Sequence, residues 1–131
     1  MDNELNLDNV DKLEKFFSAL SILQANELQS EKSKRHMLLH MDVDYFVFRG
    51  RREGELMGRL VERFANSNQI NFADISDILS EMQQETQLVG LPTGERSRYE
   101  RVYAVLLENA EKSFDIAAND KLLPPISAKS R

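Results

Sequence analysis

The apolar residues between positions 99 and 117 recur at spacings of three and four, and this pattern restricts the fold more than any other feature. Such spacing places them on one side of an α-helix of about five turns, because each turn takes about 3.6 residues. The stripe consists of Tyr99, Val102, Tyr103, Leu106, Ala110, Phe114 and Ala117. Thr93 can cap the start of this helix, and Asn119 and Asp120 end it. We therefore predict a long helix near the C-terminus with one buried side.

Three earlier segments show the same helical spacing. The first begins near Asp8 or Asn9, either of which can cap a helix, and should continue as a solvated helix through the polar residues 29–35. The second covers residues 56–64, and the third follows Asn71, another cap. Their stripes are Val10, Leu13, Phe16, Phe17, Leu20 and Leu23; Leu56, Met57, Leu60, Val61 and Phe64; and Phe72, Ile75, Leu79 and Met82. We expect a mainly α fold, a compact bundle of about four helices whose long first and last members pack together.

Residues 37–48 fit two kinds of secondary structure. One set of apolar residues alternates with polar ones, as in a half-buried strand: Met37, Leu39, Met41, Val43, Tyr45 and Val47. Another set shares one helical face: Leu39, Val43, Phe46 and Val47. Aromatic and β-branched residues favour a short strand or small hairpin here, paired with residues 86–91 or with another chain. An α+β fold is therefore the alternative class.

Three glycines follow this segment at intervals of four residues, namely Gly50, Gly54 and Gly58. On a helix they would share one face and allow another helix to approach closely. Glycine also lowers helix propensity, so we expect residues 49–54 to be a flexible passage that precedes the helix at 56–64.

The length of 131 residues and the absence of cysteine favour one domain without disulfides, thiol chemistry or zinc knuckles. We expect a helical domain at 1–120 and a disordered tail at 121–131, because Pro124 and Pro125 cannot continue a helix. His36 and His40 have no evident third ligand, so we expect no metal and no cofactor. The acidic start lacks a secretory signal and no apolar run is long enough to span a membrane, which predicts a cytoplasmic protein.

The segment Leu39-His40-Met41-Asp42-Val43-Asp44-Tyr45-Phe46 resembles the first palm strand of the Y-family translesion DNA polymerases. The resemblance covers eight residues and implies that Asp42 is a metal ligand and that Tyr45 and Phe46 lie under an incoming nucleotide. Two-metal phosphoryl transfer needs further carboxylates, which that family supplies from a later Ser-x-Asp-Glu segment. This chain has no such segment. We therefore expect solvated aspartates on a polar face, and no enzyme.

Residues 67–74 are similar to the second half of a calcium-binding helix–loop–helix. Counting back places Arg63 at the first ligand position and Ala65 at the third, where calcium needs side-chain oxygens. The pattern therefore excludes calcium but predicts a tight helix–loop–helix in which Ile70 and Phe72 turn into the core.

Arginine gathers in two clusters, and the second includes two tyrosines. If folding brings the clusters together, they could bind nucleic acid or an acidic protein surface, and Tyr99 could stack on a base or fill a pocket of the partner. The alternative is that Glu53, Glu55, Glu95 and Glu100 neutralise this charge in surface pairs. The candidate partner-binding residues are Arg49, Arg51, Arg52, Arg96, Arg98, Tyr99, Arg101 and Tyr103.

Taken together, these patterns favour a small non-enzymatic regulator or adaptor that acts by protein–protein contact, such as a chaperone, antiactivator or immunity-type protein. It would bind another protein or form a homodimer, and the five Met residues can adapt to an irregular surface. The alternative function is a nucleic-acid-binding transcriptional regulator that uses Arg clusters at 49–63 and 96–101. The net charge of −5 excludes neither function, because acidic and basic residues are segregated along the chain.

Overall fold

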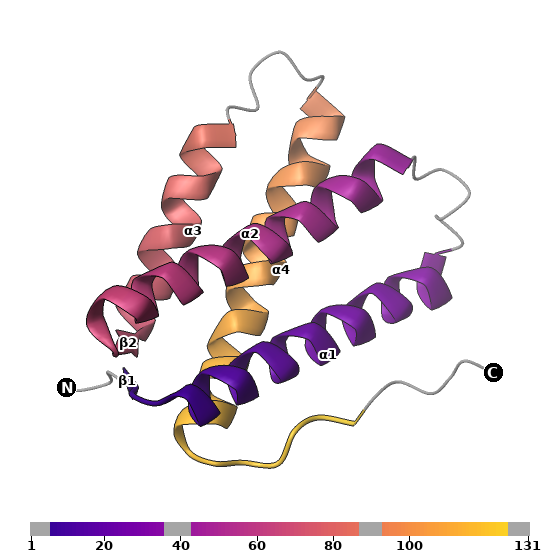
Figure 1. Ribbon diagram of the computed structural model, residues 1–131. Coiled ribbons are helices and arrows are strands. Elements are labelled where there is room, and N and C mark those ends of the chain that lie inside the picture. The colour runs from indigo at the N-terminus through magenta and orange to yellow at the C-terminus, as the bar shows by residue number, and fades with distance from the viewer. Residues whose placement is uncertain (1–5, 36–42, 87–92, 126–131) are drawn as a thin grey trace.

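The computed structural model describes residues 6–35, 43–86 and 93–125. It is a mainly α bundle with a small antiparallel pair of strands (Figure 1), which confirms the predicted fold class. The helices are α1 (Val10–Arg35), α2 (Val43–Ser67), α3 (Phe72–Thr86) and α4 (Thr93–Ala118), and the strands are β1 (Asn6–Leu7) and β2 (Ile70–Asn71).

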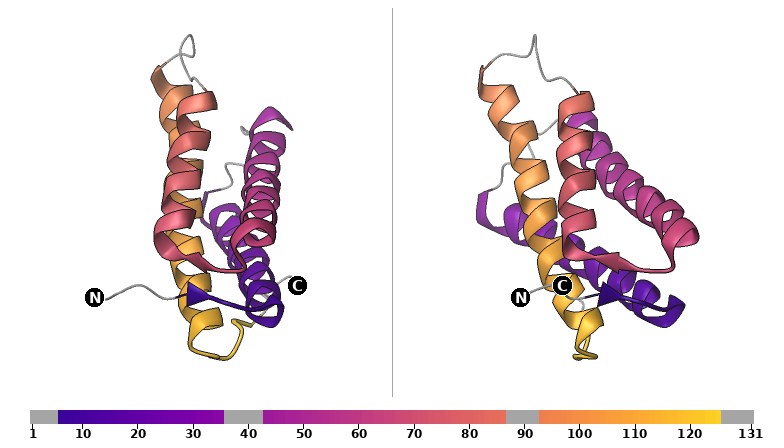
Figure 2. Two further views of the ribbon diagram at one scale, coloured as in Figure 1. Left: turned by 60° about the vertical axis from the view of Figure 1, so that its left-hand side comes forward. Right: turned by 90° about the vertical axis from the view of Figure 1, so that its left-hand side faces the viewer.

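The two long outer helices, α1 and α4, make the most extensive helix–helix contact. Helix α3 lies beside α4, and α2 contacts both of them. In the left view of Figure 2, α3 and α4 lie on one side of the molecule and α1 and α2 on the other. The predicted packing of the first helix against the last is therefore confirmed.

Side-chain caps begin two of the helices where the sequence predicts them. The Asn9 side-chain oxygen accepts a hydrogen bond of 2.9 Å from the backbone N–H of Lys12 at the start of α1. At the start of α3, Asn71 Oδ1 accepts from the N–H of Asp74 at 3.2 Å, and Asp74 Oδ2 accepts from the N–H of Asn71 at 3.0 Å. This reciprocal capping box satisfies backbone donors that have no partner inside the helix.

Two residues in the left-handed backbone region end helices. Asn68, with φ of 61°, follows α2, and its N–H donates to the carbonyl of Phe64 at 2.7 Å. Asp120, with φ of 54°, follows α4, and the N–H of Lys121 donates to the carbonyl of Ile116 at 2.9 Å. The second arrangement is a Schellman motif. It ends α4 at the position predicted from Asn119 and Asp120.

The strand pair joins the residues before α1 to the connection between α2 and α3. Asn6 pairs with Asn71 and Leu7 with Ile70 in antiparallel register. Leu7 and Ile70 are fully buried, and Phe72 packs against the core. The inward positions of Ile70 and Phe72 are those predicted from the helix–loop–helix pattern. The pairing itself was not predicted, because two-residue strands carry no periodic signal.

Aromatic residues from three helices meet in the core. The rings of Phe16 and Phe114 lie 6.4 Å apart between centroids, and those of Phe72 and Phe114 lie 5.9 Å apart. All seven residues of the predicted α4 stripe are buried. Val10 and Val61 were also assigned to buried stripes, and this was wrong: their exposed fractions are 54% and 49%.

The strand prediction for residues 37–48 is wrong for residues 43–48, which form the first turns of α2. Residues 37–42 lie outside the described part of the chain. Helix α2 also runs without interruption through residues 49–54, where we expected a flexible passage. A helix satisfies its own backbone hydrogen bonds, and it places Phe48, Arg52 and Leu56 on one inward side at intervals of four residues.

Candidate interaction surface

The two predicted arginine clusters meet at one carboxylate, that of Glu27 on α1. Arg49 Nη2 on α2 lies 2.6 Å from Glu27 Oε1, and Arg101 Nη2 on α4 lies 4.0 Å from Glu27 Oε2. Arg49 also donates to the backbone carbonyl of Gln24 at 3.2 Å, and it is only 6% exposed. Arg49 therefore joins α1 to α2 inside the molecule. Glu27 was not among the acidic residues expected to neutralise these clusters.

The predicted tyrosines pack on Phe48 of α2. The ring centroids of Tyr99 and Tyr103 lie 4.7 Å and 5.9 Å from that of Phe48, and both tyrosines are buried. The Tyr103 hydroxyl lies 2.5 Å from the hydroxyl of Thr86 at the end of α3. The guanidinium of Arg52 lies 5.3 Å from the centroid of the Phe48 ring. In this arrangement Tyr99 and Tyr103 stabilise the contact of α4 with α2 and α3.

The remaining arginines of the predicted site have different surroundings. Arg52 pairs with Glu55 at 2.9 Å, as the surface-pairing alternative expected. The Arg101 side chain is 63% exposed, Arg51 is exposed, and Arg96 is half-buried. The Arg98 side chain lies outside the described part of the structure, as do His36, His40 and Asp42.

A groove of about 250 Å³ lies between α1 and α2, beside Arg49. Its walls include Ser21, Gln24 and Leu28 of α1 and Arg49 and Glu53 of α2. Burial raises the pKa of the Glu53 carboxyl above its ordinary value of 4.5, against hydrogen bonds from Ser21 and Gln24 and the charge of Arg49, which lower it.

Gln24, which lines this groove, also takes part in a buried amide contact. Asn109 Nδ2 of α4 donates to Gln24 Oε1 of α1 at 2.7 Å, and both residues are 5% exposed. Sequence reasoning missed Gln24 and Asn109, because neither breaks the apolar pattern of its helix. Buried polar groups are costly unless they are paired, so this contact fixes the alignment of α1 on α4.

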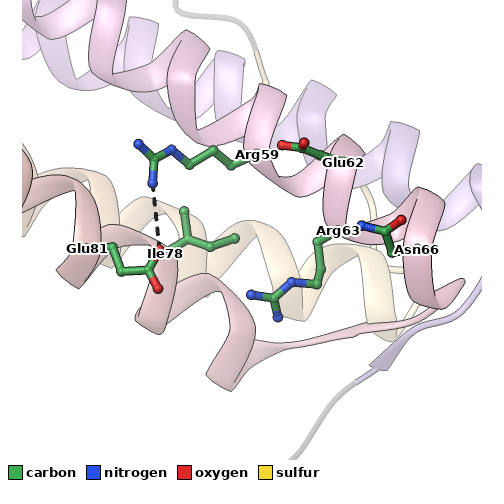
Figure 3. Close-up of a pocket in the computed structure, with 6 residues that line it drawn as sticks. All are labelled: Arg59, Glu62, Arg63, Asn66, Ile78 and Glu81. Atoms are coloured by element: carbon green, nitrogen blue, oxygen red, sulfur yellow. Dashed lines mark ion pairs between the residues drawn. The ribbon is translucent and has the colours of Figure 1, made fainter.

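A second pocket, of about 420 Å³, lies between α2 and α3. Figure 3 shows Arg59 and Arg63 extending from α2 toward α3, which contributes Ile78 and Glu81. Arg63 pairs with Asp74 at the start of α3. Ion pairs therefore join the two helices beside this pocket.

Arg59 contacts three carboxylates, one on α2 and two on α3. It lies 2.6 Å from both Glu55 and Glu85 and 3.7 Å from Glu81. The hydrogen bond from Arg59 holds the pKa of the Glu85 carboxyl below its ordinary value, and the same bond raises the pKa of Arg59. Arg59, Arg63 and Glu81, which line this pocket, are thus paired within the chain, whereas Glu62 in the same lining forms no ion pair with the described residues.

The outward side of α2 lies between the two pockets, sharing Gly50 with the groove beside α1 and Glu62 with the pocket beside α3. In both views of Figure 2, α2 lies at the edge of the molecule. Between positions 47 and 65 only two of its exposed residues are charged, Arg51 and Glu62. We call this surface the outer face of α2, and it consists of Val47, Gly50, Arg51, Gly54, Gly58, Val61, Glu62 and Ala65.

No contact within the described residues requires a glycine at any of the three glycine positions of the outer face. A Cβ atom added at Gly50, Gly54 or Gly58 would meet nothing within 4 Å, and none of the three has a positive φ. Glycine inside a helix costs about 1 kcal/mol relative to alanine. Three open glycines on one face therefore lower the stability of α2 without easing any contact in the described part of the chain.

The signal for this face was present in the sequence as the four-residue spacing of the glycines. It was discounted there because residues 49–54 were expected to interrupt the helix. Once α2 is continuous from Val43 to Ser67, the glycines and Val61 fall on one side of a single helix.

No family model, curated protein or solved structure matches this chain. Among residues 6–35, 43–86 and 93–125, no helix has both the length and the apolar character needed to cross a membrane. Over those same ranges, no three His, Asp or Glu side chains are grouped so that they could hold a metal ion.

Proposed function

We propose that this protein is a small regulator or adaptor that acts by protein–protein contact, and that the outer face of α2 is its contact surface. The observation that carries the proposal is the composition of that face: its centre consists of valine, alanine and glycine, and its two charged residues, Arg51 and Glu62, lie at one edge. Val47 and Val61 are 40% and 49% exposed. Interface centres are depleted of charged residues in this way.

The three open glycines support the same conclusion through their energetics. They destabilise the isolated helix, and they also leave the backbone of α2 uncovered by side chains. A partner that packs on this backbone gains close contact, which offsets the cost. Arg51 and Glu62 then lie at the rim, where charges contribute orientation more than affinity.

The same geometry weakens the case for nucleic-acid binding through the arginine clusters. Arg49 is buried against Glu27, Arg52 is paired with Glu55, and Tyr99 and Tyr103 pack on Phe48. Among the predicted groups that the structure describes, few remain exposed to neutralise phosphates. We therefore expect no DNA or RNA mobility shift at low salt, and a shift that weakens as salt rises would favour the alternative.

The test is site-specific photo-crosslinking in cells. A photoreactive phenylalanine analogue replaces Val61 on the outer face or, as a matched control, Leu107, an exposed apolar residue of α4. We expect a crosslinked product of defined mass from position 61 and none above background from position 107. Equal yields at the two positions, or no product at position 61, would contradict the proposal.

A further inference from the structure

We propose that the partner on the outer face of α2 is the same face of a second copy of this chain, packed antiparallel across a two-fold axis near residue 56. This inference rests on the proposed function, because it names the occupant of that contact surface. It follows from the positions of the exposed residues, from their charges and from the open glycines.

The exposed positions of α2 are symmetric about the middle of the helix. Reversing the helix end for end about residue 56 exchanges Val47 with Ala65 and Gly54 with Gly58. It also exchanges Gly50 with Glu62 and Arg51 with Val61, so every exposed position between 47 and 65 falls on another exposed one. Two antiparallel copies therefore present matching faces over about 27 Å of helix, at 1.5 Å per residue.

The two charges of this face are opposite in sign and lie on the same side of it. Arg51 and Glu62 are eleven residues apart, which is about three helical turns, so both project from one edge of the stripe. A two-fold axis perpendicular to the helix keeps that edge common to both copies. Measured along the helix, Arg51 of one copy then lies within about 1.5 Å of the level of Glu62 in the other copy.

These charges distinguish the antiparallel arrangement from the parallel one. A parallel pair, related by a two-fold axis along the helices, would place this edge on opposite sides of the two copies, so Arg51 would lie beside Gly50 and Glu62 beside Val61 of the other copy, and neither charge would meet an opposite one. An antiparallel pair gives two opposite-charge contacts related by symmetry. Within the described part of the chain, neither Arg51 nor Glu62 forms an ion pair, so both are available to a second copy.

The glycines lie where the two helices would cross. Gly54 and Gly58 are nearest the axis and face each other across it, with Gly50 one turn farther out. Interaxial distances of packed helices run from about 8 to 10 Å and depend on the side chains at the contact. Glycine at the crossing allows the short end of that range, and Val47 and Val61 of each copy then pack beside it.

Charge-reversal variants test whether the partner on the outer face is a second copy of this chain. Sedimentation velocity across the micromolar range is measured for the parent chain, Arg51→Glu, Glu62→Arg and the double variant. We expect each single reversal to weaken dimerisation by about fivefold or more, because it replaces two attractive contacts with two repulsive ones. The double variant restores both pairs and should return to within about twofold of the parent. Lys112→Glu, a charge reversal at an exposed position of α4, is the matched control and should leave dimerisation unchanged.

Cysteine pairing tests the orientation, since the chain has no cysteine of its own. Val47→Cys and Ala65→Cys should form a disulfide when the two variants are mixed. Val47→Cys alone should not, because its two copies lie about 27 Å apart in the antiparallel pair. Disulfide formation by Val47→Cys alone would show a parallel pair and overturn the inference.

The outcomes separate this inference from the proposed function. A parent chain that remains monomeric, or a double variant that is not restored, overturns the second copy as partner. If position 61 still crosslinks to a different protein in cells, the proposed function stands without a homodimer. If position 61 gives no crosslink at all, both fail.

Discussion

Arg49 of α2 and Glu27 of α1 lie 2.6 Å apart, with the Arg49 side chain 7% exposed and that of Glu27 24% exposed. Helices α1 and α2 are not among the pairs with extensive backbone contact, and the side chain of Arg49 reaches from one helix to the other. Arg49 also binds the Gln24 carbonyl, which places one guanidinium between two groups of α1. The pair positions the helix that carries the outer face.

Removing one member of the Glu27–Arg49 pair should lower the stability of the protein. Glu27→Ala removes a carboxylate that lies 2.6 Å from the buried guanidinium of Arg49, and we expect the free energy of unfolding to fall by about 1.5–3 kcal/mol. Urea unfolding followed by circular dichroism measures this change. Glu108→Ala, which breaks an exposed pair with Lys112, is the control and should cost at most about 1 kcal/mol. A loss for Glu27→Ala no larger than that of the control would contradict a structural role for the pair.

Glu53 should give the protein a pH-dependent stability of defined sign. Burial raises its pKa in the folded state above 4.5, so the folded state binds this proton more tightly than the unfolded state. The contribution of Glu53 to the free energy of unfolding is therefore present below pH 4.5 and is lost as the pH rises through the raised pKa. Glu53→Gln should be more stable than the parent at neutral pH and equal to it in acid.

Urea titrations at several pH values test this expectation, with the exposed Glu111→Gln as the control for removal of one charge. The difference between Glu53→Gln and the parent should grow as the pH increases from the acid side. A difference that is constant with pH would show that the carboxyl is not desolvated in the folded protein. Glutamine can still accept the hydrogen bond from Ser21, so that contact is retained.

The stability of the protein should depend on the capping side chain of Asn71 at the start of α3. Asn71→Ala removes the acceptor for the N–H of Asp74, and we expect a loss of about 1 kcal/mol. Asn71→Ser supplies another good capping oxygen and should recover most of that loss. Thermal and urea unfolding of the three proteins provide the comparison. Equal destabilisation by alanine and serine would indicate that Asn71 acts through its place in β2 and not as a cap.

Helices α1, α3 and α4, the second half of α2, both asparagine caps and the α4 stripe could be predicted because each depends on local spacing. Residues 43–48 could not, since their apolar positions satisfy both a period of two and a helical face, and the choice depends on Phe48 packing against Tyr99 and Tyr103 about fifty residues later. The Glu27–Arg49 pair has the same origin, because residues 22 positions apart meet only after folding. The candidate surface was misplaced for this reason: a helix predicted to start at residue 56 has no continuous outer face.

Replacement of the central glycine should separate the stability of the chain from its association. Gly54→Ala adds a methyl group that meets nothing within 4 Å in one copy, so the free energy of unfolding of the dilute protein should rise by up to about 1 kcal/mol. The same methyl group lies at the crossing point of the proposed dimer and should weaken association. Urea unfolding at low concentration and sedimentation velocity at high concentration measure the two effects on one variant. Ala104→Gly, at an exposed position of α4, is the matched reverse substitution and should lower stability without affecting association. If Gly54→Ala is stabilised and associates as well as the parent, the glycine is not at a close helix contact and the proposed crossing point is wrong.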